Sequence, residues 1–112
     1  MENLQGLERA LGHQFSNIKL LAAAVTHSSF ANEQRRGTEY NERLEFLGDS
    51  VLSIVVSEDL FTSRRHLPEG ELTRIRAALV CETSCYEFAK KIGLGQYLRL
   101  GRGEENSGGR TR

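Results

Sequence analysis

The sequence predicts an all-α domain, and three observations support that fold class. Apolar residues recur at helical spacing along nearly the whole chain. The single proline, Pro68, stands where it suits the first turn of a helix. No Asn-Gly or Asp-Gly pair is present to mark a β-hairpin. A chain of 112 residues can bury a core without disulfides or metals, so we expect one domain over residues 1–112.

The first part of the chain predicts two short helices. Leucines at helical spacing over residues 4–11 indicate the first helix, and Gly12 follows as its stop signal. Apolar residues over 18–25 indicate the second helix, with Ser16 or Asn17 as its N-cap.

A long central helix is expected from about residue 39 to residue 61 or 62. It follows an exposed loop over residues 32–39, in which Arg35 and Arg36 are solvated or touch phosphate. Residues 51–60 are apolar on nearly all sides, which predicts a helix that is buried on most sides. Their β-branched side chains would also suit a strand, but the length of the segment favours a helix.

The remainder predicts two further helices, a short segment and a loop. Residues 68–80 form the first helix, whose early acidic residues complement its dipole. Residues 83–92 form the second, which Gly93 ends. Residues 94–100 are expected to form at most one turn. The Gly-rich, polar residues 101–112 predict a mobile loop.

Composition limits the functional classes. The formal net charge is zero, so composition gives no support for nucleic-acid binding. No further Cys or nearby His completes a zinc site with Cys81 and Cys85, and we interpret both as buried small residues in a reducing compartment. The N-terminus resembles no secretory signal, and no window approaches the roughly 20 apolar residues of a membrane span. We therefore expect a cytoplasmic protein without a membrane partner.

Three carboxylates are close together in the central helix. At 3.6 residues per turn, Glu42, Glu45 and Asp49 lie on a narrow arc of one face. Acids stacked in this way repel one another, and they are the oxygen ligands that Mg²⁺ prefers. The alternative is a solvated acidic face. The enzymatic interpretation requires that Glu45 and Asp49 converge on one pocket that captures a divalent ion.

The string Asn-Glu-Arg-Leu-Glu-Phe-Leu-Gly-Asp-Ser at residues 41–50 resembles the signature of the ribonuclease III family. The resemblance continues in three further segments: residues 7–28, which end in Thr26-His27-Ser28; the block at 68–80; and the loop Gly-x-Gly-Glu…Ser-Gly-Gly-Arg at 101–110.

The resemblance implies a helical ribonuclease III-type endonuclease that cleaves double-stranded RNA in rRNA and mRNA processing. Its cofactor would be Mg²⁺, with Mn²⁺ as a substitute, and its products would have 5′-phosphate and 3′-hydroxyl ends. By matching position, Glu45 and Asp49 are the catalytic and metal-binding residues: Glu45 ligates the metal and Asp49 orients the attacking water. Glu42 would support the site or lie on the dimer surface, and Glu69 would be a supporting acid near the cleft. The family acts as a homodimer.

In the family, the Gly-rich loop leads into a helix of the form Glu-x-x-Leu-Ala-Asp-x-x-Glu-Ala, whose acids complete the metal site. The sequence ends at Arg112, before that helix, so we expect a C-terminally incomplete catalytic domain without a double-stranded-RNA-binding domain. Glu104 and Glu105 are not expected to substitute, because a metal site needs ligands on rigid elements. We therefore expect the isolated chain to bind Mg²⁺ weakly and to leave RNA uncut.

Two other functions are considered. A non-catalytic ribonuclease III-like module would bind RNA or dimerise without cutting, and would be expected to lose acids from the signature. An unrelated helical interaction module would have the acids only as a solvated face. His27 could ligate a metal or move a proton, but a lone His after a helix is more often a structural hydrogen-bonding residue.

Overall fold

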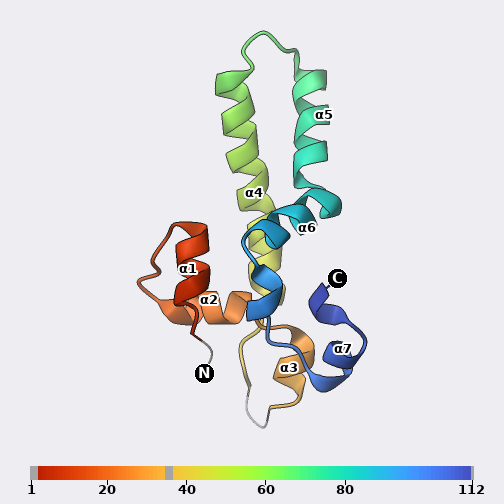
Figure 1. Ribbon diagram of the computed structural model, residues 1–112. Coiled ribbons are helices and arrows are strands. Elements are labelled where there is room, and N and C mark those ends of the chain that lie inside the picture. Colours follow the sequence, from red (N-terminus) through yellow and green to blue (C-terminus); the bar gives the residue numbers. More distant parts are fainter. Residues whose placement is uncertain (1–2, 35–36, 112) are drawn as a thin grey trace.

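The computed structural model describes residues 3–34 and 37–111, and within them it is helical (Figure 1). The prediction of an all-α fold is confirmed: the only β-type pairing in these residues is an isolated parallel bridge between Thr26 and Arg99. Arg35 and Arg36, expected in an exposed loop, lie outside the described residues. In order, the elements are α1 (Gln5–Leu11), α2 (Ile18–Ala24), α3 (Ser28–Asn32), α4 (Glu42–Ser63), α5 (Glu69–Val80), α6 (Glu82–Lys91), the 3₁₀ turn η1 (Leu94–Tyr97), α7 (Arg102–Asn106) and the 3₁₀ turn η2 (Gly109–Thr111).

Helix α1 ends, and helix α2 begins, where the sequence predicts. Gly12 adopts a left-handed conformation, with φ of 70°, and its N–H caps the carbonyls at the end of α1. Asn17 precedes α2, and its side chain accepts a hydrogen bond from the N–H of Lys19. The short helix α3 was not expected. It begins directly after His27 and ends at Asn32, the first residue of the predicted loop.

The buried core lies at the junction of the N-terminal helices with the segment that follows α6. Its buried members come from α1, α2 and their flanks, and side chains from residues 92–98 pack against them. The cluster consists of Leu4, Leu7, Leu21 and Val25, with Phe15, Ala22, Ile92, Leu94, Tyr97 and Leu98 at its edge.

The prediction that α4 is buried on most sides was wrong. Helices α4 and α5 form an antiparallel hairpin that extends away from the rest of the chain (Figure 1), and α5 packs along one side of α4. Among the α4 residues, only Leu60 is buried. Phe46, Ile54 and Phe61 are 80%, 68% and 74% exposed. The radius of gyration is 16.3 Å, whereas a compact chain of this length would have about 13 Å. The described residues therefore leave an apolar face of α4 uncovered.

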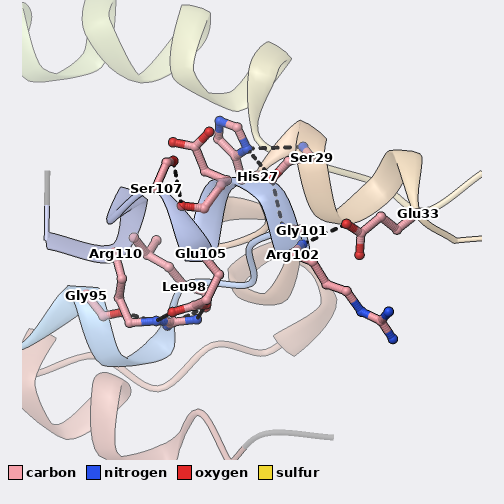
Figure 2. Close-up of polar contacts among 11 residues, drawn as sticks. His27, Ser29, Glu33, Gly95, Leu98, Gly101, Arg102, Glu105, Ser107 and Arg110 are labelled. Carbon is pink, nitrogen blue, oxygen red and sulfur yellow. Dashed lines mark hydrogen bonds and ion pairs between the residues drawn. The ribbon is translucent and has the colours of Figure 1, made fainter.

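The segment predicted as a Gly-rich loop instead contains α7 and η2. Figure 2 shows the contacts that hold it. Gly101 donates its N–H to Oγ of Ser29 at 2.8 Å, and Arg102 donates its N–H to a carboxylate oxygen of Glu33 at 2.7 Å. Arg110 donates to the carbonyl oxygens of Gly95 and Leu98 at 2.8 and 2.7 Å. Composition suggested a mobile loop. The segment is instead held by contacts to residues around α3 and η1, which are distant in the sequence and which composition does not reveal.

The prediction that the two cysteines are buried was also wrong. Cys81 and Cys85 are both exposed free thiols. The backbone of Cys81 is extended, with φ of −71° and ψ of 164°, so it separates α5 from α6. Within the described residues, no helix combines the length and the apolar character needed to cross a bilayer.

Candidate active site

The three acids of the signature lie in the first two turns of α4. Glu42, Glu45 and Asp49 are all exposed, and helical geometry puts them on one side of the helix. Glu42 and Glu45 occupy the first turn, where the positive end of the helix dipole stabilises negative charge. Neither Glu45 nor Asp49 forms an ion pair with another described residue; the pairs on the surface use other acids, such as Glu71 with Arg74.

Asp49 borders a shallow, open cavity of about 460 Å³ that is lined by α4 and by Arg76 of α5. Asp49, Ser53 and Ser57 are spaced four residues apart and present one carboxylate and two hydroxyls along it. From α5, Arg76 donates from Nη1 to the Oγ of Ser57 at 2.8 Å. The cavity therefore has oxygen ligands on one side and a guanidinium on the other. Its lining includes Asp49 but not Glu45, so the expected convergence of the two acids on one pocket is not found in this cavity; they share only a face of the helix.

Glu69 is not brought to the other acids within this chain. It begins α5 and lines a second cavity, of about 630 Å³, together with Phe61 near the end of α4. Phe61 is twelve residues beyond Asp49 on the same helix, which corresponds to about 18 Å along the axis. Within one chain, Glu69 therefore lies too far from Asp49 to support it directly. Arg76 lines both cavities and so lies between Asp49 and Glu69.

The donor set suits a hard divalent cation. Two exposed carboxylates one helical turn apart, Glu45 and Asp49, match the one or two carboxylates that usually hold Mg²⁺ beside waters and phosphate. Residues 3–34 and 37–111 contain no group of three or more His, Cys, Asp or Glu residues arranged to hold a metal. Glu45 and Asp49 are therefore the described residues whose chemistry and spacing would suit such a cation.

His27 has a structural role, as expected. It precedes α3, and its Nδ1 accepts a hydrogen bond from the N–H of Ser29 at 3.0 Å. The Oγ of Ser29 lies 2.7 Å from the same nitrogen. Both contacts cap the helix that holds the 101–111 segment, so the imidazole stabilises that connection.

Glu105 is also engaged. Its carboxylate pairs with the guanidinium of Arg110 (Figure 2), and Nε of Arg110 donates to it at 2.8 Å. This hydrogen bond holds the pKa of Glu105 below its ordinary value. Because the carboxylate is committed to Arg110, the contact supports the expectation that Glu105 does not substitute for a metal ligand.

Two contacts have no signal in the sequence. Arg74 pairs with Glu71 on the surface, as spacing on a helix allows, but Arg76 on the same helix donates to Ser57 of α4 inside the hairpin. Arg99 was not singled out, yet its Nε donates to the buried Oγ1 of Thr26 at 2.9 Å. No local pattern could have identified the second contact, since the partners are 73 residues apart.

Comparison with known proteins finds relatives along nearly the whole chain. A family model described as "Ribonuclease-III-like" matches residues 17–112. The chain is 57% identical over 109 residues to Ribonuclease 3 of Clostridium beijerinckii, which covers 97% of this chain and 47% of that protein. It is 50% identical over 113 residues to Ribonuclease 3 of Listeria monocytogenes, which covers 100% of this chain and 49% of that protein. The chain thus spans about half the length of these relatives.

A solved structure shows the same fold. It is the nuclease domain of ribonuclease III from Campylobacter jejuni, described as having structural flexibility in a region involved in dimer formation. The TM-score is 0.89 at 42% sequence identity, and the match covers 98% of this chain and 73% of that one. With the sequence match, this shows that the chain belongs to the ribonuclease-III-like family.

Proposed function

We propose that the chain forms most of the catalytic domain of a Mg²⁺-dependent endoribonuclease that cleaves double-stranded RNA to 5′-phosphate and 3′-hydroxyl ends. The supporting observation is that Glu45 and Asp49 are exposed, one turn apart on α4 and free of ion pairs with described residues. An acidic face of this kind would repel RNA unless a cation covered it. The relatives named Ribonuclease 3 support the same activity.

The two acids would have different tasks. Glu45, in the first turn, would hold the metal. Asp49, at the cavity edge beside Ser53, would accept a hydrogen bond from the attacking water and orient it toward the phosphorus. When bound, Mg²⁺ would supply neutralisation of the phosphodiester charge and a lower pKa for a bound water. Glu42 would support the charge balance of the first turn.

The proposed substrate is duplex RNA from rRNA and mRNA processing. A-form RNA is recognised by shape, 2′-hydroxyls and phosphates, so we expect weak sequence preference and binding that weakens as salt rises. We place the protein in the cytoplasm, where such RNA is made in bacteria and where the exposed thiols Cys81 and Cys85 stay reduced.

The proposed assembly is a homodimer that covers the exposed apolar face of α4. Monomeric proteins rarely leave a contiguous apolar patch of this kind uncovered. The face includes Phe46, Leu47, Val51, Ile54, Val55 and Phe61, all of them exposed. The C. jejuni nuclease domain is likewise described with a region involved in dimer formation.

The test is cleavage of an end-labelled RNA duplex by the full-length gene product. Asp49→Asn is expected to lower the rate at least about 100-fold while duplex binding changes little, because the carboxylate acts on the reaction rather than on affinity. Asp59→Asn is the matched control: Asp59 is exposed on the same helix, ten residues and about 15 Å further along. Full cleavage by the Asp49 variant, or equal loss of binding and cutting, would contradict the proposal.

The 112 residues by themselves are proposed to be inactive. Two carboxylates hold Mg²⁺ weakly, and the described residues offer no third ligand beside them. Robust, Mg²⁺-dependent cutting of the same duplex by the purified chain would show that its own residues suffice.

A further inference from the structure

A buried hydroxyl lies where three separate parts of the chain meet. Thr26 is fully buried, with 0% of its surface exposed. Its Oγ1 donates to the carbonyl oxygen of Ala22 at 2.6 Å and accepts a hydrogen bond from Nε of Arg99 at 2.9 Å. The guanidinium of Arg99 also lies 4.9 Å from the centre of the Phe30 ring. The Thr26 side chain thus connects α2 with the segment that follows η1.

The backbone on either side of Thr26 strengthens the same connection. Arg99 donates its N–H to the carbonyl oxygen of Val25 at 2.8 Å and accepts the N–H of His27 at 2.9 Å. These two bonds form the parallel bridge between Thr26 and Arg99. The side chain and the backbone of Arg99 therefore both hold the backbone of residues 25–27 in place.

That piece of backbone holds the start of α4. The carbonyl oxygen of Thr26 accepts the N–H of Asn41 at 3.0 Å, and Asn41 is the N-cap of α4. The side chain of Asn41 does not cap its own helix; its amide nitrogen lies 3.4 Å from the Ala24 carbonyl oxygen, at the end of α2. The carbonyl oxygen of Asn41 in turn accepts the N–H of Glu45 at 2.7 Å. A continuous path of hydrogen bonds thus leads from Arg99 through Thr26 and Asn41 to Glu45.

The first half of α4 has little other support. Because α5 runs antiparallel to α4 and ends at Val80, it packs on the far half of the helix (Figure 1). Residues 45–51 are exposed without a break. The position of the acids therefore depends on the anchor at Asn41 more than on side-chain packing.

We propose that Thr26 and Arg99 are positioning residues that fix the N-terminal anchor of α4 and thereby the carboxylates of Glu45 and Asp49. The inference rests on the proposed function, in which those carboxylates act on the phosphodiester. Neither Thr26 nor Arg99 needs to touch RNA or metal for this role. Their effect passes through Asn41, so it falls on the reaction step and not on substrate affinity.

The test compares Thr26→Val, which keeps the shape of the side chain and removes the hydroxyl, with Thr26→Ser, which keeps the hydroxyl. In the full-length gene product, Thr26→Val is expected to lower kcat roughly 10- to 100-fold with KM within about twofold, as displacement of catalytic groups by about 1 Å does. Thr26→Ser is expected to stay within about threefold of wild type. Arg99→Met, which removes the guanidinium and leaves the backbone bonds, is the second variant if Thr26→Val does not fold.

Two controls separate positioning from general destabilisation. Leu7→Val removes a buried methylene on α1, away from Asn41, and is expected to leave kcat unchanged at a similar loss of unfolding free energy. Hydrogen exchange of the Glu45 amide, measured on the full-length gene product, is expected to accelerate in Thr26→Val and not in Thr26→Ser.

The outcomes are distinct. An unchanged kcat in both Thr26→Val and Arg99→Met, an equal loss in Leu7→Val, or failure of Thr26→Ser to restore kcat would overturn the inference. Full activity of Asp49→Asn would instead overturn the proposed function. In that case the Glu45 amide still decides the inference: exchange that Thr26→Val leaves unchanged would refute the anchor itself.

Discussion

Arg76 on α5 donates a hydrogen bond to the hydroxyl of Ser57 on α4 at 2.8 Å, and both side chains line the cavity bordered by Asp49. The contact joins the two arms of a hairpin in which many apolar residues are exposed. Because Arg76 is half-buried, its hydrogen bond is less screened by solvent than the surface pair of Arg74 with Glu71. The polar contact therefore matters for how α5 sits against α4.

The first prediction concerns this contact. Arg76→Met is expected to lower the free energy of unfolding by about 1 to 2 kcal/mol, since it removes a hydrogen bond from a charged group and leaves Ser57 without its partner. Arg74→Met is the matched control, because Arg74 lies two residues away on the same helix, makes an exposed pair, and its loss is expected to change stability by less than about 1 kcal/mol. Urea denaturation followed by circular dichroism measures both. Equal losses would mean that burial of the Arg76 contact contributes nothing.

The second prediction concerns the apolar face of α4. Ile54→Glu is expected to raise the dimer dissociation constant at least about 100-fold, because it puts an unpaired charge into an apolar contact. Leu20→Glu serves as the control, since Leu20 is exposed on α2, outside that face. Sedimentation equilibrium of the full-length gene product measures the constant. A wild-type dimer that both substitutions leave intact would locate the interface elsewhere.

The third prediction is a pH dependence. The hydrogen bond from Arg110 lowers the pKa of Glu105, so the contact is fully stabilising above the ordinary Glu pKa of about 4.3. The stabilisation is lost as the pH falls through the lower pKa of the folded state. Titration of the Glu105 carboxyl by NMR is expected to give a midpoint below the ordinary value. In Arg110→Met the midpoint should return to it; an identical midpoint in both proteins would contradict the assigned cause.

The fourth prediction concerns Cys81. The Ser84 side chain, and then its backbone N–H, lower the pKa of this exposed thiol at the start of α6. Ser84→Ala is therefore expected to slow alkylation of Cys81 by iodoacetamide at pH 7.5, because less thiolate is present. Cys85, in the same protein, provides an internal reference. A slowdown shared by both thiols would indicate a general change in α6 instead.

Much of the fold was predictable because its signals are local. Gly12 and Asn17 end and begin helices through contacts with neighbouring residues, and the periodicity of α1 and α2 follows from the buried side they share. The acids on α4 were predictable for the same reason, since spacing alone puts Glu45 and Asp49 on one face.

The errors arose where the deciding partners lie far away in the sequence. Apolar periodicity indicates that a face of α4 prefers to be covered, but not whether this chain covers it, and the exposure of Ile54 shows that the described residues do not. The order of residues 101–111 depends on Ser29, Glu33 and the carbonyls of η1, which composition does not reveal. The anchor formed by Thr26 and Arg99 has no sequence signal for the same reason.

The bridge between Thr26 and Arg99 also has a consequence for biosynthesis. Its partners are separated by 73 residues, so at ribosomal rates of about 5 to 20 residues per second the second appears roughly 4 to 15 seconds after the first. Throughout that interval a nascent chain already contains the whole acidic signature, yet lacks Arg99, which we propose to hold the start of α4 in position. Translation thus delays assembly of the proposed site until most of this sequence has been made.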